Sequence, residues 1–116
     1  MKDIIQFSDF DKVDIRVGQI TLAEVVPKSK MLKLQVDLGS EIGTRTILAS
    51  IAGSDPAGAA AHYSLAKPKV LVVVNFAPRE MKGIVSEGML LAGQCENKIV
   101  WLADINGVVP NGTQVS

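Results

Sequence analysis

Several short stretches of the chain place an apolar residue at every second position, which is the periodicity of β-strands. The stretch 13–26 begins in this way, and 31–39 repeats the pattern after a Pro- and Lys-containing break. Gly18 interrupts the first stretch, and a glycine inside a strand predicts a bulge or a sharp bend. A turn at 40–43 then leads to a third predicted strand, 44–52.

Residues 53–66 have a different pattern, because they are rich in alanine and lack alternation. Asp55 followed by Pro56 is typical of a helix N-cap and the first helical position. Alanine has the highest helix propensity, so we predict a short helix here. A single helical turn is also predicted at 8–13, with Ser8 as its cap and acidic residues in its first turn.

The remaining stretches predict further strands. The unbroken apolar run within 67–76 favours a strand buried on both faces, and 88–93 and 98–104 predict two shorter strands. Asn-Gly occurs at 106–107 and at 111–112, which indicates two tight turns. Three strands, a helix and then further strands predict an all-β fold with a short helix, the OB-fold, a five-stranded Greek-key barrel that binds ligands on one face.

Length and composition favour a single domain, 1–116, in the cytoplasm. The 116 residues include one cysteine, Cys95, which forms no internal disulfide and fits a reducing compartment. The chain has no apolar run long enough to span a membrane, and its N-terminus lacks the features of a signal peptide.

The net charge is zero, with 12 basic and 12 acidic residues, but the charges are segregated. Residues 28–45 hold four basic against two acidic residues, and residues 67–82 hold four against one. The segments 1–14 and 83–116 are each acidic by two charges. If the two basic segments meet in space, one face of a neutral protein is positive.

Catalysis has little support in the sequence. One histidine and one cysteine cannot form a zinc site, and no P-loop, GxGxxG or catalytic-triad pattern is present. His62 is expected on the surface, and Asp14, Asp37 and Glu41 are expected to be solvated. We therefore expect no enzyme activity, no metal and no cofactor.

Three motifs, in this order and at this spacing, resemble the structure-specific tRNA-binding domain family: "DFDKVDIRVGQI", "KMLKLQVDLG" and "NFAPREMKGIVSEGMLLAG". That family includes small dimeric tRNA-binding proteins, the C-terminal extension of bacterial methionyl-tRNA synthetase and the CsaA proteins, described as export-related chaperones. The resemblance covers about residues 7–115. Many members carry Asn-Ala-Asp-Lys where this chain has "PKSK" at 27–30.

The resemblance implies an OB-fold homodimer, paired through its N- and C-terminal segments, that recognises folded tRNA by shape and phosphate backbone. It also implies a possible association with an aminoacyl-tRNA synthetase. The alternative is a CsaA-like chaperone that binds unfolded polypeptide in protein export. The RNA-binding positions implied by the motifs are Lys30, Lys33, Arg79, Lys82, Ser86, Glu87 and Met89.

For these positions the residues themselves leave two interpretations open. Arg79 and Lys82 flank a turn, from which long cationic side chains reach phosphates, but charges on loops are also ordinary solvated residues. Ser86 and its neighbours either contact RNA or form a plain turn beside a core methionine. Phe10 and Phe76 are expected to be core or dimer contacts, so recognition by stacking on aromatic residues is not expected. The two termini either pair across a two-fold axis or fold back on their own barrel.

Overall fold

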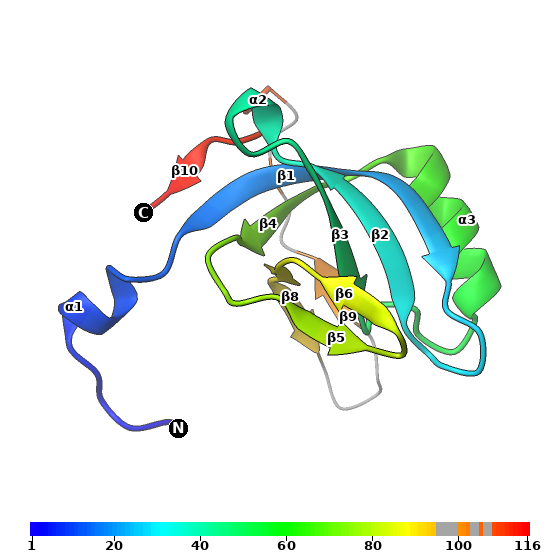
Figure 1. Cartoon of the computed structure of the whole chain (residues 1–116), viewed down its shortest axis with the longest axis horizontal. Helices are drawn as coiled ribbons and strands as arrows, with labels where there is room; N and C mark the ends of the chain where they lie inside the picture. The colour runs from blue at the N-terminus through cyan, green and yellow to red at the C-terminus, as the bar shows by residue number, and fades with distance from the viewer. Residues whose placement is uncertain (95–99, 103–104, 106–107) are drawn as a thin grey trace.

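The computed structural model is a strongly curled β-sheet with one helix longer than a single turn (Figure 1). It describes residues 1–94, 100–102, 105 and 108–116. The predicted all-β class with a short helix is confirmed. In chain order the elements are α1 (Phe7–Phe10), β1 (Ile15–Val25), β2 (Leu32–Asp37), α2 (Gly39–Ile42), β3 (Thr44–Ala49), α3 (Pro56–Ala66), β4 (Lys69–Val73), β5 (Arg79–Met81), β6 (Ile84–Ser86), β7 (Met89–Leu90), β8 (Ala92–Gln94), β9 (Val100–Leu102) and β10 (Gln114–Val115).

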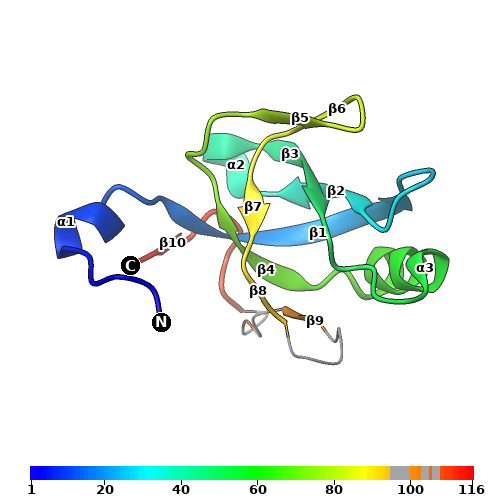
Figure 2. The same ribbon diagram turned by 90° about the horizontal axis from the view of Figure 1, so that it is seen from below.

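The main sheet has the strand order β3-β2-β1-β4-β7, with every pair antiparallel and β10 attached to β1. The long β1 pairs with β4 through its first half and with β2 through its second half. This exchange of partners curls the sheet into an OB-like half-barrel. A view from below shows β5 and β6 as a separate hairpin on the outside of the curl (Figure 2).

Gly18 has a role other than the predicted one. A Cβ atom at Gly18 would lie 2.7 Å from Cγ1 of Val36 and 2.9 Å from Cδ2 of Leu38, both on the inner face of the curl. The register irregularity between β1 and β2 lies further along, between Ile20 and Leu22. The prediction of a bulge at Gly18 is therefore wrong, whereas the sharp bend stays a prediction; the glycine is also needed because apolar side chains approach its backbone closely.

The core lies inside the curl and follows the predicted alternation. In β2, buried and partly exposed residues alternate along the whole strand. The β4 segment is buried at most of its positions, as the unbroken apolar run predicted. The fully buried side chains are Ile20, Leu32, Leu34, Val36, Leu38, Ile47, Val70 and Val72.

The predicted helix 53–66 is confirmed as α3, which packs against β1. The Asp55 carboxylate caps it by accepting from the Gly58 N–H at 3.1 Å, and Pro56 occupies the first turn. The cap of α1 is not Ser8 but Gln6, whose backbone N–H donates to the Asp9 carboxylate at 2.9 Å. Asp9, the third residue of the helix, accepts from the Gln6 N–H as in a capping box, and this bond makes Gln6 the N-cap. Ser8 lies within the helix and cannot take that position.

The C-terminal segment folds back on its own barrel. Gln114 and Val115 pair with the beginning of β1, and the Gly112 N–H donates to the Val17 carbonyl at 2.7 Å. The turn at 111–112 is as predicted, with a φ of 90° at its glycine. The N-terminal segment pairs with no strand in the part of the chain that the structure describes, and its apolar side chains are exposed there: Met1, Ile4, Ile5, Phe7 and Phe10.

Three sequence predictions are refined. The turn at 40–43 is a helical turn, α2, and the single strand expected at 88–93 is divided into β7, which pairs with β4, and β8, which pairs with β9. Of the strand expected at 98–104, residues 100–102 form β9. Cys95 and the turn expected at 106–107 lie outside the described residues.

Candidate nucleic-acid interface

The β5–β6 hairpin places a basic turn on the outside of the half-barrel. Both residues of its two-residue turn, 82–83, have positive φ angles, 53° and 78°, as the type I′ turn of a tight hairpin requires. Because side chains alternate between the faces of a strand, Arg79 and Met81 share one face. Glu80 and its cross-strand partner Val85 share the other face. The only acid of the hairpin therefore points away from Arg79.

A groove of about 470 Å³ lies against the face that carries Arg79. Its volume falls within the range of about 300–1,000 Å³ that is usual for ligand pockets. Among the residues that the structure describes, Arg79 is the one charged residue in the lining, which is otherwise apolar apart from a serine. The lining residues are Leu48, Phe76, Ala77, Arg79, Met81, Ser86, Gly88 and Met89. A smaller cavity of about 190 Å³ shares Leu48 and Met89 with it.

Phe76 lies in this groove and is 50% exposed, so it is not a core residue, and the alternative that it is a dimer contact stays a prediction. The sequence suggested burial because Phe76 follows directly on the apolar run of β4. In the structure the chain leaves the sheet at Asn75, and the aromatic ring is carried out to the groove. Met89 is likewise 45% exposed and belongs to the lining rather than the core.

Ser86 and Glu87 connect the groove to the edge of β3. The Leu48 N–H donates to Oγ of Ser86 at 3.0 Å, and this hydroxyl donates to the Gly88 carbonyl at 3.2 Å. The Thr46 N–H donates to Oε1 of Glu87 at 3.2 Å, and the Glu87 N–H donates to the Thr46 carbonyl at 2.8 Å. Among the described strands, no continuous backbone ladder joins β3 to β6 or β7. The bonds of Ser86 and Glu87 to β3 close the barrel there instead. We name these bonds the seam. Both residues have a structural task, and their contact with RNA stays a prediction.

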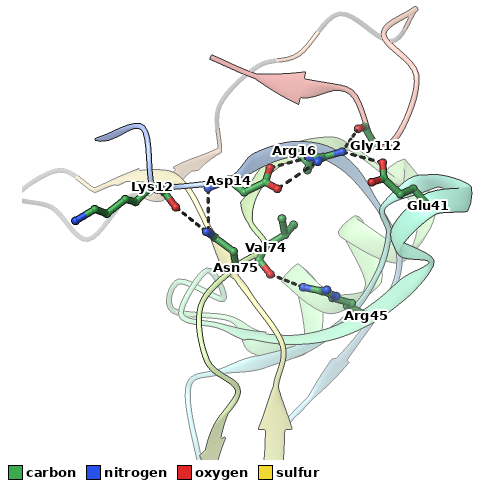
Figure 3. Close-up of polar contacts among 8 residues, drawn as sticks. All are labelled: Lys12, Asp14, Arg16, Glu41, Arg45, Val74, Asn75 and Gly112. Carbon is green, nitrogen blue, oxygen red and sulfur yellow. Dashed lines mark hydrogen bonds and ion pairs between the residues drawn. The ribbon is translucent and has the colours of Figure 1, made fainter. Parts of the chain in front are cut away.

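Arg16 is not available to a ligand, because two carboxylates hold it (Figure 3). Its Nε donates to Asp14 at 2.7 Å and its Nη1 to Glu41 at 3.2 Å. The hydrogen bond that Arg16 donates to Asp14 is the largest of the causes that raise the pKa of Arg16. Asp14 and Asp37 were expected to be solvated, but they are half-buried and hydrogen-bonded; Glu41 is exposed as expected.

The chain that leads to Phe76 is anchored on both sides (Figure 3). The Asn75 carboxamide accepts from the Asp14 N–H at 2.9 Å and donates to the Lys12 carbonyl at 2.6 Å. The Val74 carbonyl accepts from Nη1 of Arg45 at 2.6 Å. These bonds fix the point at which the backbone turns from the sheet toward the groove.

The two basic segments approach each other at the seam. Arg45 of the first segment donates to the carbonyl of Val74 in the second segment at 2.6 Å, and to the Glu87 carbonyl at the seam at 3.2 Å. Lys33 lies opposite Leu48 in the β2–β3 ladder, so its side chain shares a face with a groove residue. Lys30 is exposed in the β1–β2 loop, and both views show this loop and the tip of the β5–β6 hairpin on the same side of the molecule (Figures 1 and 2).

The cations divide into two groups by their contacts. Arg16, Arg45 and Lys69 bond to carboxylates or backbone carbonyls of the chain. Across residues 1–94 and the other described positions, the ion pairs found involve Arg16 alone, so the predicted positions Lys30, Lys33, Arg79 and Lys82 have no carboxylate partner there. These four side chains carry charge that solvent or a ligand must neutralise.

In the part of the chain that the structure describes, no group of three potential His, Cys, Asp or Glu ligands could hold a metal ion. Within the same residues, no helix has the length and apolar character needed to cross a membrane.

The structure is a small OB-like half-barrel in which a basic hairpin, without an acidic partner among the described residues, lies beside a mainly apolar groove. The family model described as "Putative tRNA binding domain" matches residues 15–114. The chain belongs to this tRNA-binding domain family, and the resemblance seen in the motifs is confirmed.

Individual relatives agree with this assignment. The methionine–tRNA ligase of Chlorobium phaeovibrioides is 42% identical over 118 residues, which cover 98% of this chain but only 15% of the ligase. Among solved structures, a MetRS-related protein from Pyrococcus horikoshii has a TM-score of 0.82 at 30% identity, covering 99% of this chain and 100% of that one. The chaperone CsaA from Bacillus anthracis has a TM-score of 0.80 at 32% identity, with 98% and 100% covered.

The groove contains residues that the sequence did not single out, above all Leu48 and Phe76. Leu48 belongs to the apolar second half of β3, so no local signal marks it as a groove residue, and its place in the groove lining depends on the later β5–β6 hairpin. For Phe76 a weak signal was present, because Asn75 and Pro78 enclose it in a segment that cannot continue a central strand.

Proposed function

We propose that residues 1–116 form one non-catalytic tRNA-binding unit that acts in the cytoplasm and holds RNA against the β5–β6 hairpin. Family membership over residues 15–114 supports the choice of ligand. The observation that carries the site is the hairpin itself, where Arg79 and Lys82 have no acidic partner among the described residues and lie beside the groove. Lys30 and Lys33 extend the same positive face.

The physical basis of this binding is charge neutralisation. Each phosphate that a Lys or Arg side chain neutralises releases condensed counterions, so the logarithm of affinity falls with the logarithm of salt by about 0.7–0.9 per contact. With four cations on this face, we expect a slope of roughly −3 to −4. A protein of zero net charge reaches this slope only if its acids lie elsewhere, as Glu80 does on the far face of the hairpin.

The test is a gel shift with total tRNA across roughly tenfold in salt. The double variant Arg79→Ala/Lys82→Ala is expected to bind more weakly and to lower the slope by about 1.5–2. The matched control is Lys2→Ala/Lys12→Ala, which removes the same charge from the segment around α1. If the control loses as much affinity as the hairpin variant, binding depends on overall charge and the proposed site is wrong. If the unmodified protein does not bind tRNA even at low salt, the proposed function is wrong.

Recognition is proposed to depend on the shape of folded tRNA. Lys30 and Lys82 lie on two separate turns and Lys33 and Arg79 on the strands β2 and β5 beside them, a spread arrangement that suits phosphates placed by a folded backbone. Folded tRNA should therefore compete better than unstructured RNA of equal length. Equal competition would show that shape contributes nothing.

The protein is also proposed to act as a homodimer through its N-terminal segment. Ile4, Ile5 and Phe7 are 88%, 64% and 77% exposed, and apolar residues grouped in this way mark interaction surfaces. Two hairpins on one dimer would bind a large RNA with avidity. Sedimentation should give a dimer that Phe7→Asp converts to a monomer with weaker tRNA binding. A monomeric wild-type protein would contradict this part.

We also propose that the same dimer associates with an aminoacyl-tRNA synthetase that is a separate chain.

A second candidate function is peptide binding by a chaperone of the CsaA kind, acting in protein export. The apolar character of the groove favours it, since Leu48, Phe76, Met81 and Met89 all line the groove. Peptide binding would tolerate salt and survive Arg79→Ala/Lys82→Ala, whereas RNA binding would not. The same salt series, with a labelled apolar peptide in place of tRNA, separates the two functions.

A further inference from the structure

We propose that the 470 Å³ groove holds one unpaired base of the bound RNA, stacked on Phe76, with the adjoining phosphate at Arg79. The inference rests on the proposed function and adds a base-dependent contact to it. Recognition by shape and phosphate contacts alone would need only the exposed cations. It would give no role to Phe76, whose half-exposed ring lines the groove together with Arg79.

The aromatic platform is the first argument. Phe76 is 50% exposed and lines the groove together with Met81 and Met89. Stacking on an aromatic ring is tolerant of base identity because every base has a π-face. Methionine side chains adapt to the shape of a planar group through their flexible thioethers. The groove thus offers a surface for a flat apolar ring without a fixed pattern of hydrogen bonds.

Preorganisation is the second argument. Asn75, the residue before Phe76, is held through its carboxamide, which accepts from the Asp14 N–H and donates to the Lys12 carbonyl. Val74, one residue earlier, accepts from Arg45 through its carbonyl. Figure 3 shows these contacts converging on the short segment where the chain leaves β4. A ring carried by an anchored backbone loses less entropy on binding than one on a free loop. Asn75 is therefore a positioning residue for the platform.

Charge complementarity is the third argument, and it favours a nucleotide over a peptide. Arg79 is the charged residue of the lining, no carboxylate of the described residues lines the groove, and Glu80 faces away. A nucleotide presents an apolar ring and an anion a few ångströms apart, which matches Phe76 and Arg79 as neighbouring groups of one groove. An apolar peptide segment would use the ring but leave the guanidinium unneutralised.

The experiment compares two labelled hexamers of equal charge by fluorescence anisotropy at low salt. One is hexaadenylate, and the other is the same ribose-phosphate chain without bases. We expect the wild-type protein to prefer hexaadenylate by roughly 5-fold or more, the lower end of what one stacked base contributes. Phe76→Leu should abolish this preference, Phe76→Tyr should retain it, and Asn75→Ala should reduce it.

Val85→Ala is the matched control, because Val85 is 49% exposed on the opposite face of the same hairpin. It should leave the preference unchanged. Circular dichroism of each variant verifies folding, which truncation of a half-exposed side chain should preserve.

Equal affinity of the wild-type protein for both hexamers overturns the inference. If total tRNA still binds in a salt-dependent way that requires Arg79 and Lys82, the proposed function stands and only the base pocket fails. If neither RNA binds while a labelled apolar peptide does, and Phe76→Leu releases it, the groove is a peptide site and both proposals fail.

Discussion

Replacing Ser86 by alanine tests whether the seam holds the barrel together. Ser86 is 4% exposed, and its hydroxyl accepts from the Leu48 N–H and donates to the Gly88 carbonyl. Alanine leaves the Leu48 N–H without this partner in a buried position. An unsatisfied buried donor costs about 1–3 kcal/mol.

The corresponding change in melting temperature follows from the size of the protein. Unfolding entropy is about 2.1 cal/mol/K per residue, which gives roughly 0.24 kcal/mol/K for 116 residues. A loss of about 1–3 kcal/mol therefore lowers Tm by about 4–12 °C. Differential scanning calorimetry measures this shift, and Ser40→Ala in the exposed part of α2 is the control, with an expected change below about 1 °C.

The same variant separates structure from recognition. Well below both melting temperatures, Ser86→Ala should bind tRNA with nearly the affinity of the wild type, because its hydroxyl is already engaged with the backbone. An unchanged Tm together with a clear loss of tRNA affinity would refute the reasoning and assign the hydroxyl to RNA.

Three further predictions concern other parts of the chain. Gly18→Ala should cost about 1–3 kcal/mol by overpacking against Val36 and Leu38, and urea unfolding measures it; an unchanged midpoint would show that β1 can shift away. Lys82→Asn should weaken tRNA binding and lower the salt slope by about 1. It should not lower Tm, since asparagine suits the positive φ of this turn; a less stable protein would contradict this. Burial raises the pKa of Tyr63 above 10.0, so the folded state holds the phenolic proton more tightly than the unfolded state. Its contribution to stability is complete below pH 10 and is lost as pH rises through the folded pKa. Absorbance titration of this single tyrosine should show a midpoint above that of the urea-unfolded protein, and coincident midpoints would exclude the shift.

Local signals predicted the elements that depend on neighbouring residues. Alternation in β2 and the Asp55-Pro56 start of α3 are properties of a few consecutive residues, and the structure agrees with both. The helical turn α1 was predicted with Ser8 as its N-cap, which is wrong. The N-cap is Gln6, because the Asp9 carboxylate accepts from the Gln6 N–H.

The site was harder to predict because its residues come together only after folding. Ser86 and Phe76 owe their environments to β3 and to the departure of the chain from β4, and no periodicity encodes either contact. The basic residues of the hairpin were visible in the sequence as a charge cluster. The ring beside them was not, because an aromatic residue after an apolar strand usually continues the core.

The seam also affects how the half-barrel moves. A strand pair joined by a ladder opens only when several backbone bonds break together, whereas Thr46 and Leu48 are held on this edge largely by two side chains. Rotation of those side chains releases the edge of β3 while the rest of the sheet stays paired. Amide hydrogens of these two residues should therefore exchange with solvent by local opening, faster than those between β1 and β2. Because the groove borders the seam, such local opening would let its width adapt to a ligand without loss of the core.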